Sequence, residues 1–179
     1  MRIQTQFLLI NIIGGVLVLG GYIFALMSHP TTRNELWGGV PENLRLWITV
    51  FMFVSAFGYC YAMYYLIFDE GLELSFFWGK FDYRIVMILL IVFLLSAASW
   101  IHTALTYIDT GSKNSWNFVQ LELWLTGISV FLIMLGLATA TGVKSTIFHF
   151  YSVIGLIAIS FHCLVLDAFL WINKFPIKH

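Results

Sequence analysis

The sequence contains few charged residues, with 9 Lys and Arg and 9 Asp and Glu among 179 residues, or 10%. Soluble globular domains carry about 25%, so this chain has too little charge to cover a surface that faces water. The two signs cancel to a formal net charge of zero, and nine basic residues are too few for the basic face that binds nucleic acid. The composition therefore excludes a soluble enzyme, a disordered chain and a nucleic-acid partner.

Cysteine and proline are also scarce, with two and three residues respectively. Cys60 and Cys163 both lie within apolar runs, so they do not form a secreted disulfide framework. We interpret each of them as a small buried apolar side chain. The chain also lacks a Gly-x-Ser-x-Gly nucleophile motif, a phosphate-binding loop and a dinucleotide-binding turn. These absences favour a binding or transport protein over an enzyme.

Hydrophobic residues are abundant, at 60% of the chain, and the mean hydropathy is +0.90. A membrane-spanning helix needs about 20 predominantly apolar residues, and none of the apolar stretches alternates as barrel strands do. We therefore predict an all-α, polytopic integral membrane protein in a lipid bilayer, folded as a single five-helix transmembrane domain over residues 1–179. The predicted spans are residues 6–27, 44–68, 83–108, 116–140 and 145–172. Four basic residues flank one side of the spans and five flank the other, which is no bias. Neither the membrane nor the orientation is therefore assigned.

The longest predicted connection, residues 28–43, shares one membrane face with residues 109–115 and the C-terminal residues. We call this face the tail side. Thr32 and Glu35 have the spacing of a capping box, so we predict a short interfacial helix over residues 31–36. On the opposite face, residues 69–82 mix acidic and bulky apolar side chains, which is typical of a segment at the membrane surface.

Ionisable residues inside spans are costly and are functional candidates by default. Because a helix rises 1.5 Å per residue, His102, Glu122 and Asp167 lie at a common depth of about 8–9 Å from the tail side. They come from three different spans, so we expect them to meet inside the bundle. His162 lies about a turn and a half deeper in the last span.

Three interpretations of these polar residues stay open. They can form a hydrogen-bonded packing network with hydroxyl groups on the same helices. They can form the polar floor of a ligand pocket that opens on the tail side. A histidine with carboxylates can also hold a metal, which makes His102 and His162 candidate ligands of a metal or haem.

Aromatic side chains gather near the same depth. Such residues usually form a belt at the membrane interface, but a cavity walled by Trp and Tyr also suits a flat apolar ligand. Tyr59 belongs to a tyrosine-rich stretch of the second span. Six of the seven tryptophans lie on the tail side: Trp37, Trp47, Trp100, Trp116, Trp124 and Trp171.

Four spans contain short segments of note, at residues 55–59, 99–102, 116–121 and 166–171. In chain order, these segments resemble the tryptophan-rich sensory protein/translocator protein family. Some positions depart from the family pattern: the first loop keeps only Trp37 and Pro41 of a segment dense in Pro and Trp. In the third span, Thr103 and Ala104 replace a pair of prolines.

The resemblance implies a five-helix bundle, often dimeric, with a pocket beneath the first loop for a tetrapyrrole or sterol. We therefore expect a non-enzymatic protein that binds or transports a porphyrin, haem, sterol or other lipid. The alternative is an accessory subunit of a larger respiratory, photosynthetic or oxidase-type membrane complex, with histidines that are structural or bind haem or pigment. A small channel or proton-coupled transporter is a third and less favoured possibility. The implied ligand-binding residues are Trp37, Trp47, Tyr59, Trp100, His102, Glu122 and Asp167.

Overall fold

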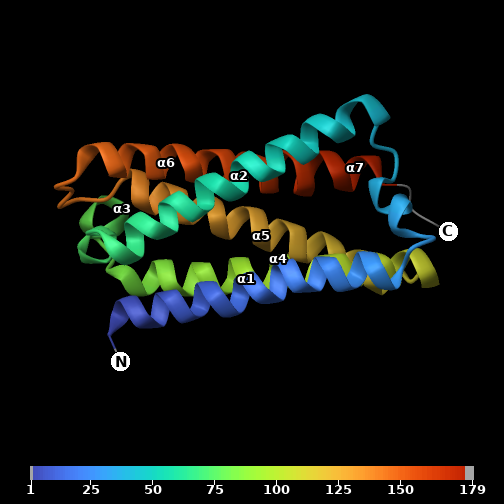
Figure 1. Cartoon of the computed structure of the whole chain (residues 1–179), viewed down its shortest axis with the longest axis horizontal. Coiled ribbons are helices and arrows are strands. Elements are labelled where there is room, and N and C mark those ends of the chain that lie inside the picture. Colours follow the sequence, from blue (N-terminus) through green and yellow to red (C-terminus); the bar gives the residue numbers. More distant parts are fainter. Residues whose placement is uncertain (1, 176–179) are drawn as a thin grey trace.

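The computed structural model describes residues 2–175 and contains five helical spans that run alongside one another (Figure 1). All five are long and apolar enough to cross a membrane, by length and composition. The prediction of an all-α five-helix bundle is confirmed, and every helix begins and ends within three residues of its predicted limits. The spans are α1 (Ile3–Ser28), α2 (Glu42–Phe68), α4 (Tyr83–Thr110), α5 (Lys113–Ala138) and the continuous helix Thr146–Lys174.

The fifth span consists of three segments with different helical geometry. It begins as α6 (Thr146–Phe161), continues as a ten-residue π-helical stretch, η3 (His162–Trp171), and ends as α7 (Ile172–Lys174). A π-helix closes its hydrogen bonds over five residues and usually occupies a single turn. This longer stretch changes which side chains share a face in the tail-side half of the span.

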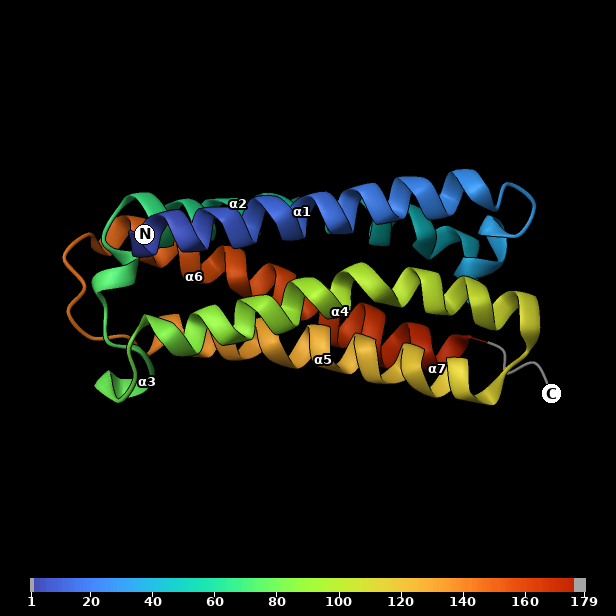
Figure 2. The same cartoon turned by 90° about the horizontal axis from the view of Figure 1, so that it is seen from below.

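The helix α5 packs against α4 and against both halves of the fifth span. Small residues at its contact faces, Thr126, Gly127 and Ser129, are buried and allow the neighbouring backbones to approach. In contrast, α1 rests mainly on α4 and α2 rests mainly on α6. Only 11% of the apolar window of α1 and 17% of that of α2 is buried, so these two helices form the outer part of the bundle (Figure 2).

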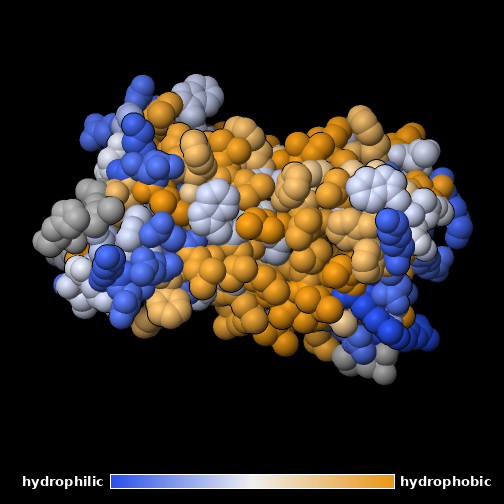
Figure 3. All heavy atoms as spheres, turned by 180° about the vertical axis from the view of Figure 1, so that it is seen from behind, coloured by the Kyte–Doolittle hydropathy of each residue, from blue (hydrophilic) through white to orange (hydrophobic). Residues whose placement is uncertain are grey.

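The surface of the molecule is banded in the way that a bilayer requires. On the face shown in Figure 3, hydrophobic residues cover the middle of the bundle and hydrophilic residues gather at its two ends. Lipid tails favour such an apolar band about 30 Å thick between polar interfaces. The banding and the five apolar helices together suggest a multi-pass membrane protein.

Two glycines define the crossing between α2 and α6. A Cβ atom on Gly58 would lie 2.6 Å from the Cα of Gly155, so the two backbones touch. One turn earlier in α2, the Ser55 hydroxyl donates a hydrogen bond of 3.2 Å to the carbonyl of Ala158. From this crossing toward the tail side, α2 diverges from the fifth span (Figure 1).

The helix α1 is seated on α4 through two glycines that the sequence places seven residues apart. A Cβ atom on Gly14 would meet the side chain of Leu94, and one on Gly21 would lie 3.1 Å from Nε2 of His102. Gly15 and Gly20 have no neighbour within 4 Å of such an atom. Gly14 and Gly21 therefore lie on the face of α1 that packs against α4, whereas Gly15 and Gly20 border open space.

The first loop contains a short helix, η1 (Arg33–Trp37), close to the predicted position. It is a 3₁₀ helix, and Thr32 precedes it without a side-chain capping bond. The hydroxyl oxygen of Thr32 is buried and makes no hydrogen bond within the described part of the chain. The predicted helix is confirmed, but its expected capping box does not form.

The loop opposite the tail side contains η2 (Gly71–Glu73) and α3 (Phe76–Gly79), and it is fastened to the start of α6. Oε1 of Glu70 accepts hydrogen bonds from the backbone N–H groups of Ser145, at 2.5 Å, and Lys144, at 2.7 Å. The hydroxyl of Tyr65 donates a longer bond of 3.4 Å to the same oxygen. Glu70 therefore joins the end of α2 to the beginning of the fifth span.

Replacing Glu70 with Gln is expected to remove a pH-dependent contribution to stability. The N–H groups of Ser145 and Lys144 and the Tyr65 hydroxyl lower the pKa of Glu70 below 4.5, although burial opposes them. Because the pKa is lowered in the folded state, this stabilisation is complete above the unfolded-state pKa and is lost as the pH falls through the folded-state value. Denaturation in detergent should show the wild type losing stability as the pH falls below about 4.5 and through the lowered pKa of Glu70. An equal loss in Glu70→Gln would contradict this assignment.

Candidate functional site

His102, Glu122 and Asp167 were predicted to meet, but each of them contacts a different neighbour. The carboxylate of Glu122 on α5 accepts a hydrogen bond from the hydroxyl of Thr103 on α4. Asp167 lies beside His162 on its own helix, with 3.6 Å between Oδ2 and Nε2. Over residues 2–175, no hydrogen bond or ion pair joins His102 to Glu122 or to Asp167.

The predicted depth is nevertheless consistent with the contact between α4 and α5. Glu122 meets Thr103, the residue directly after His102, at the level that counting along the helices indicated. Successive residues of an α-helix point about 100° apart. His102 therefore faces Gly21 of α1 while Thr103 faces α5.

The contact between His162 and Asp167 depends on the π-helical stretch. Residues five apart on an α-helix point about 140° away from each other. In a π-helix the same spacing corresponds to one hydrogen-bonded turn, so the two side chains come to the same side of η3. His162 is buried, and the carboxylate of Asp167 is partly exposed.

One nitrogen of His162 has no partner within the described residues. Nε2 faces Asp167, but Nδ1 is buried and makes no hydrogen bond. The imidazole packs against the ring of Phe51 on α2, with 6.0 Å between ring centroids and a tilt of 36°. Buried polar atoms are nearly always hydrogen-bonded, so this nitrogen is an exception that needs a physical reason.

The interior of the tail side is filled by aromatic side chains that contact one another. The ring centroid of Trp171 lies 5.6 Å from that of Trp100, 6.0 Å from that of Trp116 and 4.4 Å from that of Phe175. Nε1 of Trp100 donates a hydrogen bond of 2.5 Å to the hydroxyl of Tyr22 on α1. Trp100, predicted to stack on a ligand, therefore already has neighbours on several sides.

Two other predicted ligand-binding residues also have neighbours within the chain. The guanidinium of Arg45 lies 5.6 Å from the ring centroid of Trp37 in the first loop. The hydroxyl of Tyr59 donates a hydrogen bond of 2.5 Å to Oδ1 of Asn11 on α1. These contacts tie the first loop to α2, and α2 to α1.

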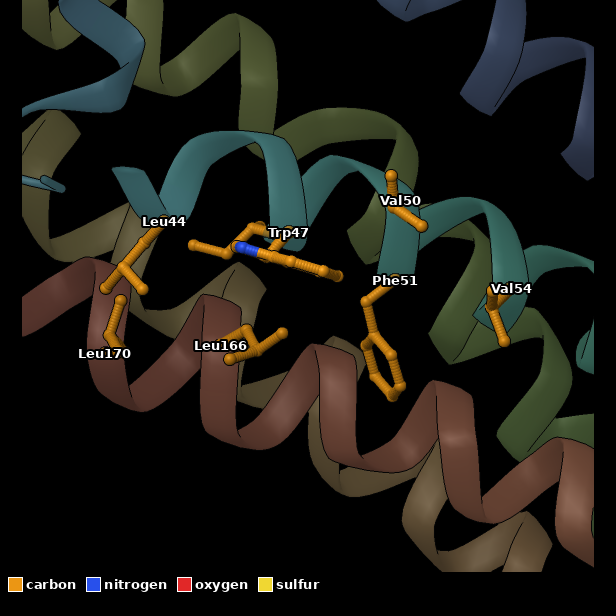
Figure 4. Close-up of a pocket in the computed structure, with 8 residues that line it drawn as sticks. Leu44, Trp47, Val50, Phe51, Val54, Leu166 and Leu170 are labelled. Carbon is orange, nitrogen blue, oxygen red and sulfur yellow. The ribbon is translucent and has the colours of Figure 1, made fainter. Parts of the chain in front are cut away.

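Trp47 is the predicted residue that lies beside open space. Its side chain is 71% exposed, and it lines a groove of about 470 Å³ between the diverging parts of α2 and η3 (Figure 4). Val50 and Val54 at the same groove are also exposed, so the groove opens to the outside of the bundle. All eight lining side chains are apolar: Leu44, Trp47, Ile48, Val50, Phe51, Val54, Leu166 and Leu170.

Sequence reasoning missed most of this groove. Apart from Trp47, its lining residues are ordinary apolar members of two spans, and nothing in their spacing distinguishes them from residues that face lipid. The groove exists because α2 diverges after its contact at Gly58. Gly58 was the available signal, since a glycine inside an apolar span often marks a close approach of two backbones.

The described residues contain no group of three or more His, Cys, Asp and Glu side chains that could hold a metal ion. The assignment of His102 and His162 as metal or haem ligands therefore stays a prediction. Neither histidine belongs to a group of candidate ligands in the described part of the chain. Cys163 is buried as predicted, whereas Cys60 lies exposed on α2, which corrects the prediction for that residue. An exposed position on an outer helix suits a small apolar side chain that faces lipid.

Comparisons with known protein families, with curated proteins and with solved structures found no match to this chain. The resemblance to the tryptophan-rich sensory protein/translocator protein family stays a prediction based on short motifs.

Proposed function

We propose that this chain is a membrane protein that binds or transports an apolar ligand, of the size and shape of a sterol, in the groove between α2 and η3. The observation that supports the proposal is a groove of about 470 Å³ lined only by apolar side chains. Small-molecule sites usually have volumes of about 300–1,000 Å³ and mostly apolar walls. The exposed edge at Trp47 would let a ligand enter from the bilayer.

The lining favours a sterol or similar lipid over a tetrapyrrole. A porphyrin carries carboxylates that need cationic partners, and a haem also needs an axial ligand. The groove lining supplies neither a basic side chain nor a histidine. In contrast, the indole of Trp47 offers a flat apolar face that suits a fused-ring ligand.

Filling the groove is expected to weaken the binding of dehydroergosterol, a fluorescent sterol, to the protein in nanodiscs. Leu166→Trp places a bulky ring inside the groove, and we expect its affinity to fall at least about tenfold. Leu95→Trp is the matched control, because Leu95 is 57% exposed on α4 and lies outside the groove. Saturable binding of the same affinity in wild type and Leu166→Trp would contradict the proposal.

The accessory-subunit alternative is supported by a different observation. The helices α1 and α2 bury little of their surface within the chain, so their outer faces are free to contact a second copy or another membrane subunit. A native mass that includes an unrelated subunit would support this alternative, and a Soret band in the untreated protein would support haem or pigment binding. A mass of one or two copies of the chain without absorbing pigment would contradict it.

A further inference from the structure

We propose that His162 recognises a hydroxyl group at the polar end of the ligand, so that the groove selects an apolar alcohol over the corresponding hydrocarbon. This inference rests on the proposed function of the groove. It assigns a polar contact to a site whose lining is otherwise apolar. It also gives a role to a histidine that belongs to no metal-ligand group in the described part of the chain.

Nδ1 of His162 lacks a hydrogen-bond partner in the described part of the chain. His162 is 7% exposed, and its Nδ1 lies buried without a hydrogen-bond partner among residues 2–175. A buried polar atom without a partner is costly, because it has lost the hydrogen bond that it makes in water. Small-molecule sites combine apolar walls with a few polar groups of this kind, which fix the orientation of the ligand.

The imidazole of His162 lies next to the groove, because it packs against a residue that lines it. The ring of Phe51 lines the groove and also packs against the imidazole of His162. Figure 4 shows the Phe51 side chain extending from α2 toward the fifth span. Leu166, four residues after His162 on η3, lines the same groove. The imidazole therefore contacts a wall of the groove without lining it, so a ligand in the groove reaches Nδ1 only if the Phe51 ring turns aside.

A hydroxyl is the ligand group that best complements Nδ1 of His162. Asp167 occupies the Nε2 side of the ring, which leaves Nδ1 for a ligand. The role of Nδ1 as donor or acceptor depends on the proton at Nε2, and a hydroxyl can complement either role because it both donates and accepts. A charged headgroup would need an opposite charge, and the groove lining contains none. An alcohol of sterol size therefore fits both the apolar groove and the nitrogen behind it.

Competition against dehydroergosterol in nanodiscs tests this assignment with cholesterol and with 5-cholestene, which has the same rings without the hydroxyl. We expect wild type to prefer cholesterol by about tenfold, a typical effect of one buried hydrogen bond. His162→Phe should bind the two competitors equally. The matched control is His149→Phe on α6, which should keep the preference because His149 lies outside the groove, with its Nε2 2.9 Å from the carbonyl of Leu137.

The outcomes separate the two proposals. If neither competitor displaces the probe from wild type and the probe itself does not bind, the proposed function fails. If both displace it equally from wild type, the groove binds sterols but the assignment of His162 is overturned. The assignment is also overturned if His162→Phe keeps the preference or if His149→Phe loses it.

A second measurement does not depend on the folding of a variant. The ¹⁵N chemical shift of Nδ1 reports hydrogen bonding at that nitrogen, and wild-type protein in nanodiscs suffices to record it. We expect the His162 signal to move when cholesterol is added and to stay unchanged with 5-cholestene. An unchanged signal with saturating cholesterol would overturn the proposal.

Discussion

Replacing Gly58 with leucine is expected to destabilise the protein by about 3 kcal/mol, at the upper end of the usual cost of overpacking. A Cβ atom at this position would lie 2.6 Å from the Cα of Gly155 and 2.8 Å from its carbonyl oxygen. Both obstacles are backbone atoms, which cannot rotate away as a side chain does. The two helices must therefore separate, and α2 has few other contacts within the bundle. Unfolding in mixed micelles by increasing SDS measures the loss.

The matched control is Gly15→Leu on α1. A Cβ atom on Gly15 has no neighbour within 4 Å, so the larger side chain extends into lipid without displacing a helix. The two variants make the same substitution in apolar spans on the outer helices. Unfolding of both at the same SDS fraction would contradict a close backbone contact at Gly58.

The arrangement of spans could be predicted from composition because lipid imposes a strict requirement on length. Backbone polar groups must be satisfied within each segment that crosses a bilayer, so long apolar runs become helices. The limits of α2 illustrate this, since the predicted span over residues 44–68 became Glu42–Phe68. The extra residues lie at the interface, where helices extend beyond the apolar core.

The faces of the helices could be predicted less well than their depths. Counting residues placed His102, Glu122 and Asp167 at one level, and the contact of Glu122 with Thr103 agrees with that level. Depth depends on a rise of 1.5 Å per residue, whereas the direction of a side chain turns by about 100° per residue. An error of one residue therefore changes depth slightly but turns a side chain toward a different helix.

The pairing of His162 with Asp167 could not be read from the sequence at all. The spacing of five residues places His162 and Asp167 on different sides of an α-helix. No residue pattern in this stretch indicates the ten-residue π-helix that the structure has. A tertiary contact lies near this stretch. A Cβ atom on Gly127 of α5 would be 2.7 Å from the Leu164 side chain and 3.2 Å from the Cys163 carbonyl, so α5 packs closely against η3.

Replacing Trp171 with alanine is expected to cost about 3–5 kcal/mol, the usual range for removing a buried tryptophan. The indole is 8% exposed and contacts the rings of Trp100, Trp116 and Phe175, so truncation leaves a cavity between α4, α5 and the fifth span. Its Nε1 also donates a hydrogen bond of 2.6 Å to the carbonyl of Leu36 in η1. The variant therefore loses both packing and an attachment of the first loop.

Two measurements check this prediction together. SDS-induced unfolding reports the loss of stability, and amide hydrogen exchange reports whether residues 33–40 lose protection. Trp124→Ala is the matched control, because Trp124 lies exposed on α5 and makes none of these ring contacts or this hydrogen bond. We expect the control to stay near wild type in both measurements. If Trp124→Ala and Trp171→Ala lose the same stability, or if exchange in the first loop does not change in Trp171→Ala, the aromatic cluster does not hold the tail side together.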